Sequence, residues 1–225
     1  MSHGDPSQES AEVERLRVQT RGTESAGASL ESRWRQIARE QASRMAVHEA
    51  ATGRSWSFAE LEALADAGTI APESRLAFPT GRGVDFVRDV LRAWKAGLPI
   101  CPLEPGQPAP DLPPPGPGIA LLKLTSGTTG SPRGVILTEA QVAADADQIV
   151  STMGLDPVCP NLGVISLAHS YGFANLVLPL LLHGVPLILV ESALPEAVKR
   201  ASAPWDRLTL PAVPALWRTW LEADA

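Results

Sequence analysis

A segment rich in glycine and hydroxyl side chains, residues 124–135 (LTSGTTGSPRGV), has the composition best suited to bind a polyphosphate. Glycine has no side chain, so its backbone N–H can approach a ligand closely. Serine and threonine hydroxyls add donors beside those amides, and Arg133 adds a permanent positive charge with forked donors. The predicted phosphate-binding residues are Thr125, Ser126, Gly127, Thr128, Thr129, Gly130, Arg133 and Gly134.

Two common nucleotide-binding loops do not fit this segment. A Walker loop requires GxxxxGK[ST] with a helix that opens at the last glycine, and the register here offers neither. The GxGxxG fingerprint of dinucleotide-binding enzymes is also missing from the sequence. Three glycines alone would fit a hairpin without a ligand equally well, so the interpretation depends on the complete string.

The string SGTTGSPRGV, residues 126–135, resembles the signature loop of one superfamily, whose usual form is [ST]SGTTGxPKGV. This superfamily contains the acyl-CoA synthetases, the adenylation domains of non-ribosomal peptide synthetases, and the luciferases. Its loop holds the β- and γ-phosphates of ATP, and the resemblance implies the same contacts for the residues named above. Arg133 stands at the usual lysine position, which keeps the charge and changes its reach and geometry. Residues 44–66 and 86–105 are similar to two earlier blocks of the family.

A second candidate site lies downstream, in SLAHSYGF at residues 166–173. A lone histidine in an apolar stretch is more often a satisfied core residue than a catalyst. The segment, however, resembles the family's P-x-x-H-x-[FY]-G block, in which the histidine and the aromatic residue face the acyl pocket. The resemblance implies that His169 is catalytic and that His169, Tyr171 and Gly172 bind the acyl substrate. Ser166 stands where proline is frequent.

Two other basic residues receive structural interpretations. His183 falls at the end of an apolar helix pattern, and we expect it to be structural. Lys123 lies within a strand before the loop, where strand packing or a salt bridge fits better than catalysis.

The resemblance implies a two-step reaction. ATP, with Mg²⁺, activates a small-molecule carboxylate such as a fatty or an aromatic acid. The acyl group then passes to the thiol of CoA or of carrier-protein phosphopantetheine. Blocks expected for the Mg²⁺ ligand, the ribose aspartate, the hinge and the lysine-bearing lid domain are not found in the sequence. We therefore expect a fragment with little activity alone, whose missing C-terminal half or an acyl carrier protein would be a partner. A non-catalytic nucleotide- or acyl-binding module and one part of a split synthetase are the alternatives.

Hydrophobic periodicity predicts an α/β fold, with mixed or parallel sheets flanked by helices. A flexible leader is expected at residues 1–29, and a partial N-terminal adenylation domain at residues 30–225. Proline density predicts an irregular connector at residues 99–118. The predicted helices begin near 30, 58, 84 and 140, and the predicted strands cover 44–49, 75–78, 119–124, 135–137, 164–167, 185–190 and 208–210.

Composition excludes several classes of protein. A formal net charge of −6 supplies no broad basic surface for nucleic acid. The apolar run at residues 174–190 is broken by Pro179, Gly184 and Pro186, so no membrane span is expected. The two cysteines form no CxxC pair and no histidine cluster has metal-ligand spacing, so we expect a cytoplasmic protein with neither a disulfide framework nor a protein-bound structural metal.

Overall fold

The computed structural model describes residues 28–68, 70–71, 74–125 and 133–223. Its helices are α2 (Leu30–Glu40), α3 (Phe58–Asp66), α4 (Val84–Lys95), α5 (Glu139–Met153), α6 (Ser170–Gly172), the π-helix η1 (Phe173–Val177), α7 (Leu178–His183), α8 (Pro195–Ser202) and α9 (Pro214–Glu222). Its strands are β1 (Met45–Glu49), β2 (Arg54–Ser57), β3 (Ile119–Thr125), β4 (Arg133–Thr138), β5 (Asn161–Gly163) and β6 (Leu187–Leu189).

The larger sheet has the strand order β2, β1, β6, β5. Strands β1 and β2 form an antiparallel pair, whereas β6 pairs in parallel with both β1 and β5. All three residues of β6 are buried, as expected for a central parallel strand covered on both faces. A single parallel bridge between Asn161 and Thr209 extends the sheet beyond β5.

The smaller sheet is built on the antiparallel hairpin of β3 and β4. Ile100 forms parallel bridges with Leu121 of β3 and with Ala77, and Leu103 forms another with Thr80. The hairpin is therefore extended on its β3 side by two short segments of the chain.

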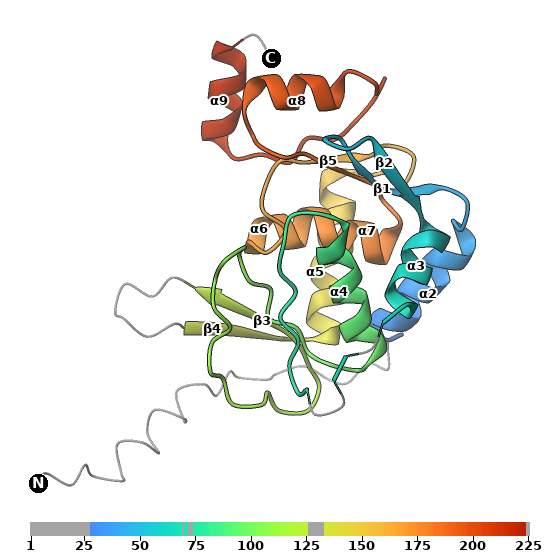
Figure 1. The fold of residues 1–225 in the computed structure, drawn as a ribbon, viewed down its shortest axis with the longest axis vertical. Coiled ribbons are helices and arrows are strands. Elements are labelled where there is room, and N and C mark those ends of the chain that lie inside the picture. The colour runs from blue at the N-terminus through green and yellow to red at the C-terminus, as the bar shows by residue number, and fades with distance from the viewer. Residues whose placement is uncertain (1–27, 69, 72–73, 126–132, 224–225) are drawn as a thin grey trace, which may run out of the picture.

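Helices α4, α5 and α7 lie between the two sheets (Figure 1). Their apolar side chains join those of α2, α3 and the larger sheet in one main core. Aromatic pairs hold this core together: Trp34 lies 6.0 Å from Phe58 and Phe86 lies 6.4 Å from Phe173, measured between ring centroids. Mixed sheets flanked by helices confirm the predicted α/β class.

Helix boundaries follow local sequence signals. Ser57 and Glu60 form a capping box at the start of α3, so the cap predicted at Ser57 is confirmed. Thr138 and Gln141 form another at the start of α5. Caps of this kind typically stabilise a helix by ~1 kcal/mol each. Helix α4 ends before Gly97, whose φ of 65° suits glycine and accounts for the predicted stop.

Three predicted strands were wrong or too long. Residues 75–78 contribute only the bridge at Ala77, and residues 208–210 only the bridge at Thr209. Near residues 164–167 the strand lies earlier, at Asn161–Gly163. Apolar side chains occur in all three segments, buried at Leu167 and mostly half-buried elsewhere, but burial does not require a continuous ladder of hydrogen bonds.

The proline-rich segment is not irregular from its first residue. Ile100 N–H donates to Ala120, while Cys101 and Leu103 N–H groups donate to the segment that contains Ala77. Pro99 and Pro102 each remove one donor, and Ile100, Cys101 and Leu103 keep theirs, so extended pairing survives around the prolines. We predicted no strand character between residues 99 and 118, and for residues 100–103 this was wrong.

The predicted leader lies outside the described residues, apart from residues 28 and 29. Within the described ranges, none of the helices has both the length and the apolar character needed to cross a bilayer.

Candidate active site

The hairpin of β3 and β4 joins the two ends of the predicted phosphate loop. Thr125 pairs with Arg133, and Leu124 pairs with Gly134. Residues 126–132 lie outside the described residues, and so do the side chains of Thr125 and Arg133. The structure thus places the backbone where the loop leaves and rejoins the sheet, and the phosphate contacts stay predictions.

Both faces of the hairpin are anchored. Leu121 is buried in the main core, whereas Leu122 packs with Cys101 and Leu103 in a separate small cluster. Burial raises the pKa of the Cys101 thiol to about 11, so this cysteine remains a neutral packing group. Helix α5 begins directly after β4 at the Thr138 cap. These contacts give the loop a rigid base.

His169 lies at the solvent-exposed end of the downstream motif. It is the N-cap residue of α6, and its Nδ1 accepts a hydrogen bond from the Tyr171 N–H at 3.3 Å. A neutral imidazole that accepts at Nδ1 carries its proton on Nε2. His169 can therefore donate a hydrogen bond to an oxygen atom from Nε2. Tyr171 is partly exposed beside it.

Gly172 is buried where two backbone segments meet. A Cβ atom at this position would lie 2.0 Å from the Ser166 carbonyl oxygen and 3.3 Å from Ile165 Cγ2. No side chain fits in this space without movement of the backbone. The glycine of the motif is thus explained by packing beneath the turn, while the substrate contact predicted for it stays a prediction.

A π-helix follows this turn at residues 173–177, and such insertions often occur at functional sites. Two asparagine side chains donate to backbone carbonyls of α6 and of the π-helix. Asn175 Nδ2 donates to the Tyr171 carbonyl at 2.9 Å, and Asn161 Nδ2 donates to the Asn175 carbonyl at 3.1 Å. Asn161 is only 1% exposed and belongs to β5, so the larger sheet supports the segment that carries Tyr171.

One carboxylate beside the motif was missed from the sequence. Ser166 Oγ donates to Glu104 Oε2 at 2.7 Å, across a separation of 62 residues. Glu104 comes directly after the paired segment 100–103, so the bond connects the smaller sheet to the turn of His169. A single acidic residue between two prolines carried no signal that would identify its partner.

Lys123 and His183 differ in their surroundings. Burial lowers the pKa of Lys123, partly opposed by Asp145, and no ion pair to Lys123 is found among the described residues. His183 lies 2.9 Å from Asp147, which also binds Arg33 at 2.7 Å. Burial and the Arg33 charge lower the pKa of His183. This arrangement agrees with a structural role for His183.

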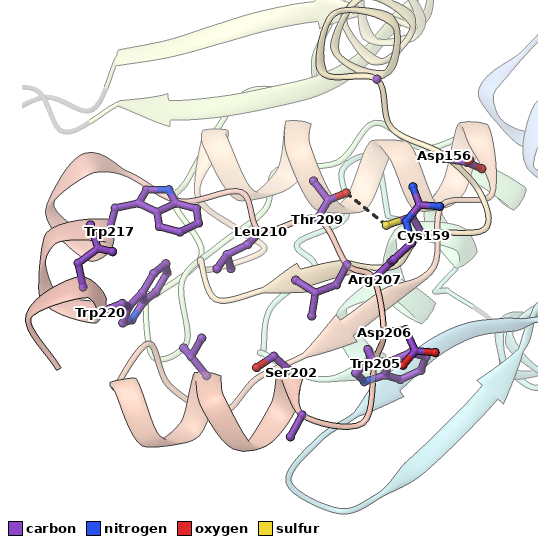
Figure 2. A pocket seen from close by; sticks show the side chains of 15 residues that line it. Asp156, Cys159, Ser202, Trp205, Asp206, Arg207, Thr209, Leu210, Trp217 and Trp220 are labelled. Atoms are coloured by element: carbon purple, nitrogen blue, oxygen red, sulfur yellow. Dashed lines mark hydrogen bonds between the residues drawn. The ribbon is translucent and has the colours of Figure 1, made fainter. Parts of the chain in front are cut away.

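A pocket of about 690 Å³ opens elsewhere, between α8, α9 and residues 205–210 (Figure 2). Trp217, Trp220 and Leu210 form one side of it, and Cys159 and Thr209 lie toward the other, with Sγ and Oγ1 3.8 Å apart. None of its lining residues belongs to either motif. Pocket size alone therefore does not locate the predicted chemistry.

Within the part of the chain that the structure describes, no group of three or more histidine, cysteine, aspartate or glutamate side chains converges as metal ligands would. Cys101 and Cys159 are both free thiols and both buried.

Comparison with known proteins decides the family. Residues 88–225 match the AMP-binding enzyme family. The chain belongs to this family of adenylate-forming enzymes. A sulfoacetate–CoA ligase from Cupriavidus necator is 30% identical over 129 residues, which cover 52% of this chain and 25% of the ligase.

Solved structures show the same fold at lower identity. The N-terminal domain of FACL13 from Mycobacterium tuberculosis has a TM-score of 0.72 and 19% identity, covering 86% of this chain and 65% of that one. O-succinylbenzoate coenzyme A synthetase from Bacillus subtilis, solved with AMP, has a TM-score of 0.71 and 17% identity, covering 86% of this chain and 64% of that one. The chain thus spans about a quarter of the ligase and under two-thirds of these structures.

Proposed function

We propose that the complete protein activates a carboxylic acid with ATP, forms an acyl-adenylate, and transfers the acyl group to a thiol. The observation that carries this proposal is the family match over residues 88–225, which includes the phosphate loop and the His169 motif. The hairpin geometry supports it, because β3 and β4 present both ends of the loop at one site.

The chemistry explains why such a loop is needed. A carboxylate is a poor electrophile, since its oxygen is a poor leaving group. Attack of a carboxylate oxygen on the α-phosphorus of ATP makes that oxygen part of AMP and releases pyrophosphate. Donors that hold the β- and γ-phosphates stabilise the charge on the departing pyrophosphate and align it for displacement. We assign this task to the backbone amides and hydroxyls of residues 125–130, with Arg133 and Gly134.

His169 acts on the other reactant in this proposal. Its Nε2–H, set by the bond that Nδ1 accepts, donates to the carboxylate and orients the attacking oxygen. Tyr171 and Gly172 form the adjoining wall of the acyl site. His169 is exposed, so further parts of the protein or the bound acid must exclude water there.

The remaining assignments are also proposals. Magnesium neutralises phosphate charge when bound, and the thiol acceptor is CoA or a carrier-protein phosphopantetheine. The acid is a small molecule, fatty or aromatic, and the location is the cytoplasm, in agreement with two free buried thiols.

The test is carboxylate-dependent exchange of pyrophosphate into ATP by the complete protein. We expect replacement of Thr128 and Thr129 together by alanine to lower exchange by at least about tenfold, or ~1.4 kcal/mol of transition-state stabilisation. Thr152→Ala, at an exposed position on α5, is the control and should exchange normally. Binding of ATP without exchange by the unaltered protein would instead indicate a nucleotide-binding module.

A further inference from the structure

Glu104 connects the two motifs through the hydrogen bond that it accepts from Ser166. We propose that Glu104 is a positioning residue, which fixes the turn carrying His169 relative to the phosphate-loop hairpin. This inference rests on the proposed function, because the turn and the hairpin must act on the same reaction for their alignment to matter. The role is indirect: Glu104 acts through Ser166.

Glu104 is held from the side of the hairpin. The Ile100 N–H donates to the Ala120 carbonyl, and the Leu122 N–H donates to the Ile100 carbonyl. These two bonds attach the segment to β3. The next bridge, between Leu103 and Thr80, holds the residue immediately before Glu104, and Leu103 also packs with Leu122 of β3. After it, the Gln107 N–H donates to the Glu104 carbonyl at 2.9 Å, and the Glu104 N–H donates to Gln107 Oε1 at 3.2 Å. The carboxylate therefore projects from a braced turn.

Ser166 is held from the side of the turn. Its carbonyl accepts the His169 N–H at 3.2 Å and lies against Gly172. Leu167, the next residue, is only 2% exposed. A shift of Ser166 is thus passed directly to the backbone of His169. The Ser166 hydroxyl, through its bond to Glu104, connects this turn to the smaller sheet.

The chemical character of the bond suits a positioning role. The distance of 2.7 Å is ideal for a hydroxyl donor and a carboxyl oxygen acceptor, and both side chains are partly shielded from water that would compete for the bond. Ser166 also stands where proline is frequent in the family motif that this segment resembles. A proline ring would fix φ covalently, whereas serine leaves φ free, so the bond to Glu104 supplies a restraint that the ring would otherwise give.

The first experiment measures hydrogen exchange in the 225-residue chain, which requires no activity. The amides of His169 and Phe173 donate to backbone carbonyls within the turn and report its order. We expect Glu104→Ala and Ser166→Ala each to speed their exchange by about tenfold, the double variant to add little more, and Gln107→Ala to do less. Unchanged exchange in Glu104→Ala would overturn the proposal.

The second experiment separates positioning from direct contact with a reactant, using pyrophosphate exchange by the complete protein. Glu104→Ala should lower kcat/KM for the carboxylate by about tenfold and leave KM for ATP within about twofold. Glu104→Gln keeps an acceptor oxygen and should restore most of the loss. A Gln variant as defective as Ala would show that the charge itself is required, which contradicts a positioning role. If the unaltered protein shows no exchange, the proposed function fails, while the hydrogen-exchange result still decides whether Glu104 orders the turn.

Discussion

The close approach at Gly172 gives a quantitative test of how the turn is built. Gly172→Ala places a Cβ atom 2.0 Å from the Ser166 carbonyl oxygen and 2.9 Å from its carbonyl carbon. Both are backbone atoms, so relief requires the turn to move by about 1 Å. Overpacking of this kind costs ~1–3 kcal/mol. Alanine gains ~1 kcal/mol over glycine in a helix, which offsets only part of the cost. Because the 2.0 Å contact is with backbone, we expect a cost of ~2–3 kcal/mol, at the upper end of that range, and so a net loss of ~1–2 kcal/mol.

Urea or thermal unfolding of the 225-residue chain measures this loss. For a chain of this size, ~1 kcal/mol corresponds to a shift of about 2–4 °C in Tm, so we expect a fall of about 2–8 °C. Gly116→Ala is the matched control, because a Cβ there meets nothing within 4 Å and its φ is not positive. Equal stability of Gly172→Ala and the unaltered chain would refute the packing argument, and with it the reason given for glycine at this position.

Two other predictions concern the histidines. His169→Ala should lower carboxylate-dependent exchange by at least about tenfold and leave ATP binding, measured by calorimetry, almost unchanged; equal losses would contradict an acyl-site role. Burial lowers the pKa of His183 from its ordinary 6.5, so the folded state favours the neutral ring. The contribution of the neutral ring to the free energy of unfolding is complete above pH 6.5, and it is lost as the pH falls through the folded-state pKa of His183. His183→Gln should therefore lose less stability than the unaltered chain when urea unfolding is followed from about pH 7 down to about pH 5, and parallel pH profiles would exclude this linkage.

Helices with complete local signals could be predicted well from the sequence. Ser57 and Glu60 stand at capping-box spacing before FAELEALAD, and the structure begins α3 there. Helix α4 carries apolar residues on one face and meets Gly97 at its end. In these elements the boundary depends on residues within one or two turns, so no distant contact is needed to locate it.

Strand boundaries were predicted less well from the sequence, because a strand exists only where a partner strand lies beside it. Ala77 and Thr209 form single bridges although apolar residues surround them. Conversely, Ile100 pairs on both sides despite the prolines at 99 and 102. Whether such a segment joins a ladder depends on which backbone passes alongside, and sequence periodicity does not contain that information.

The candidate site shows the same division at the level of chemistry. The loop and the His169 motif could be found because their residue types are adjacent in the sequence. Glu104 and Asn161 could not, since each supports the turn through an atom that only the fold brings near. Asn161 Nδ2 satisfies a carbonyl of the π-helix, and that need arises only because the helix departs from α-helical hydrogen bonding. A sequence motif thus identifies the side chains expected to face the reactants. The side chains that position those motif residues can be identified only from the folded structure.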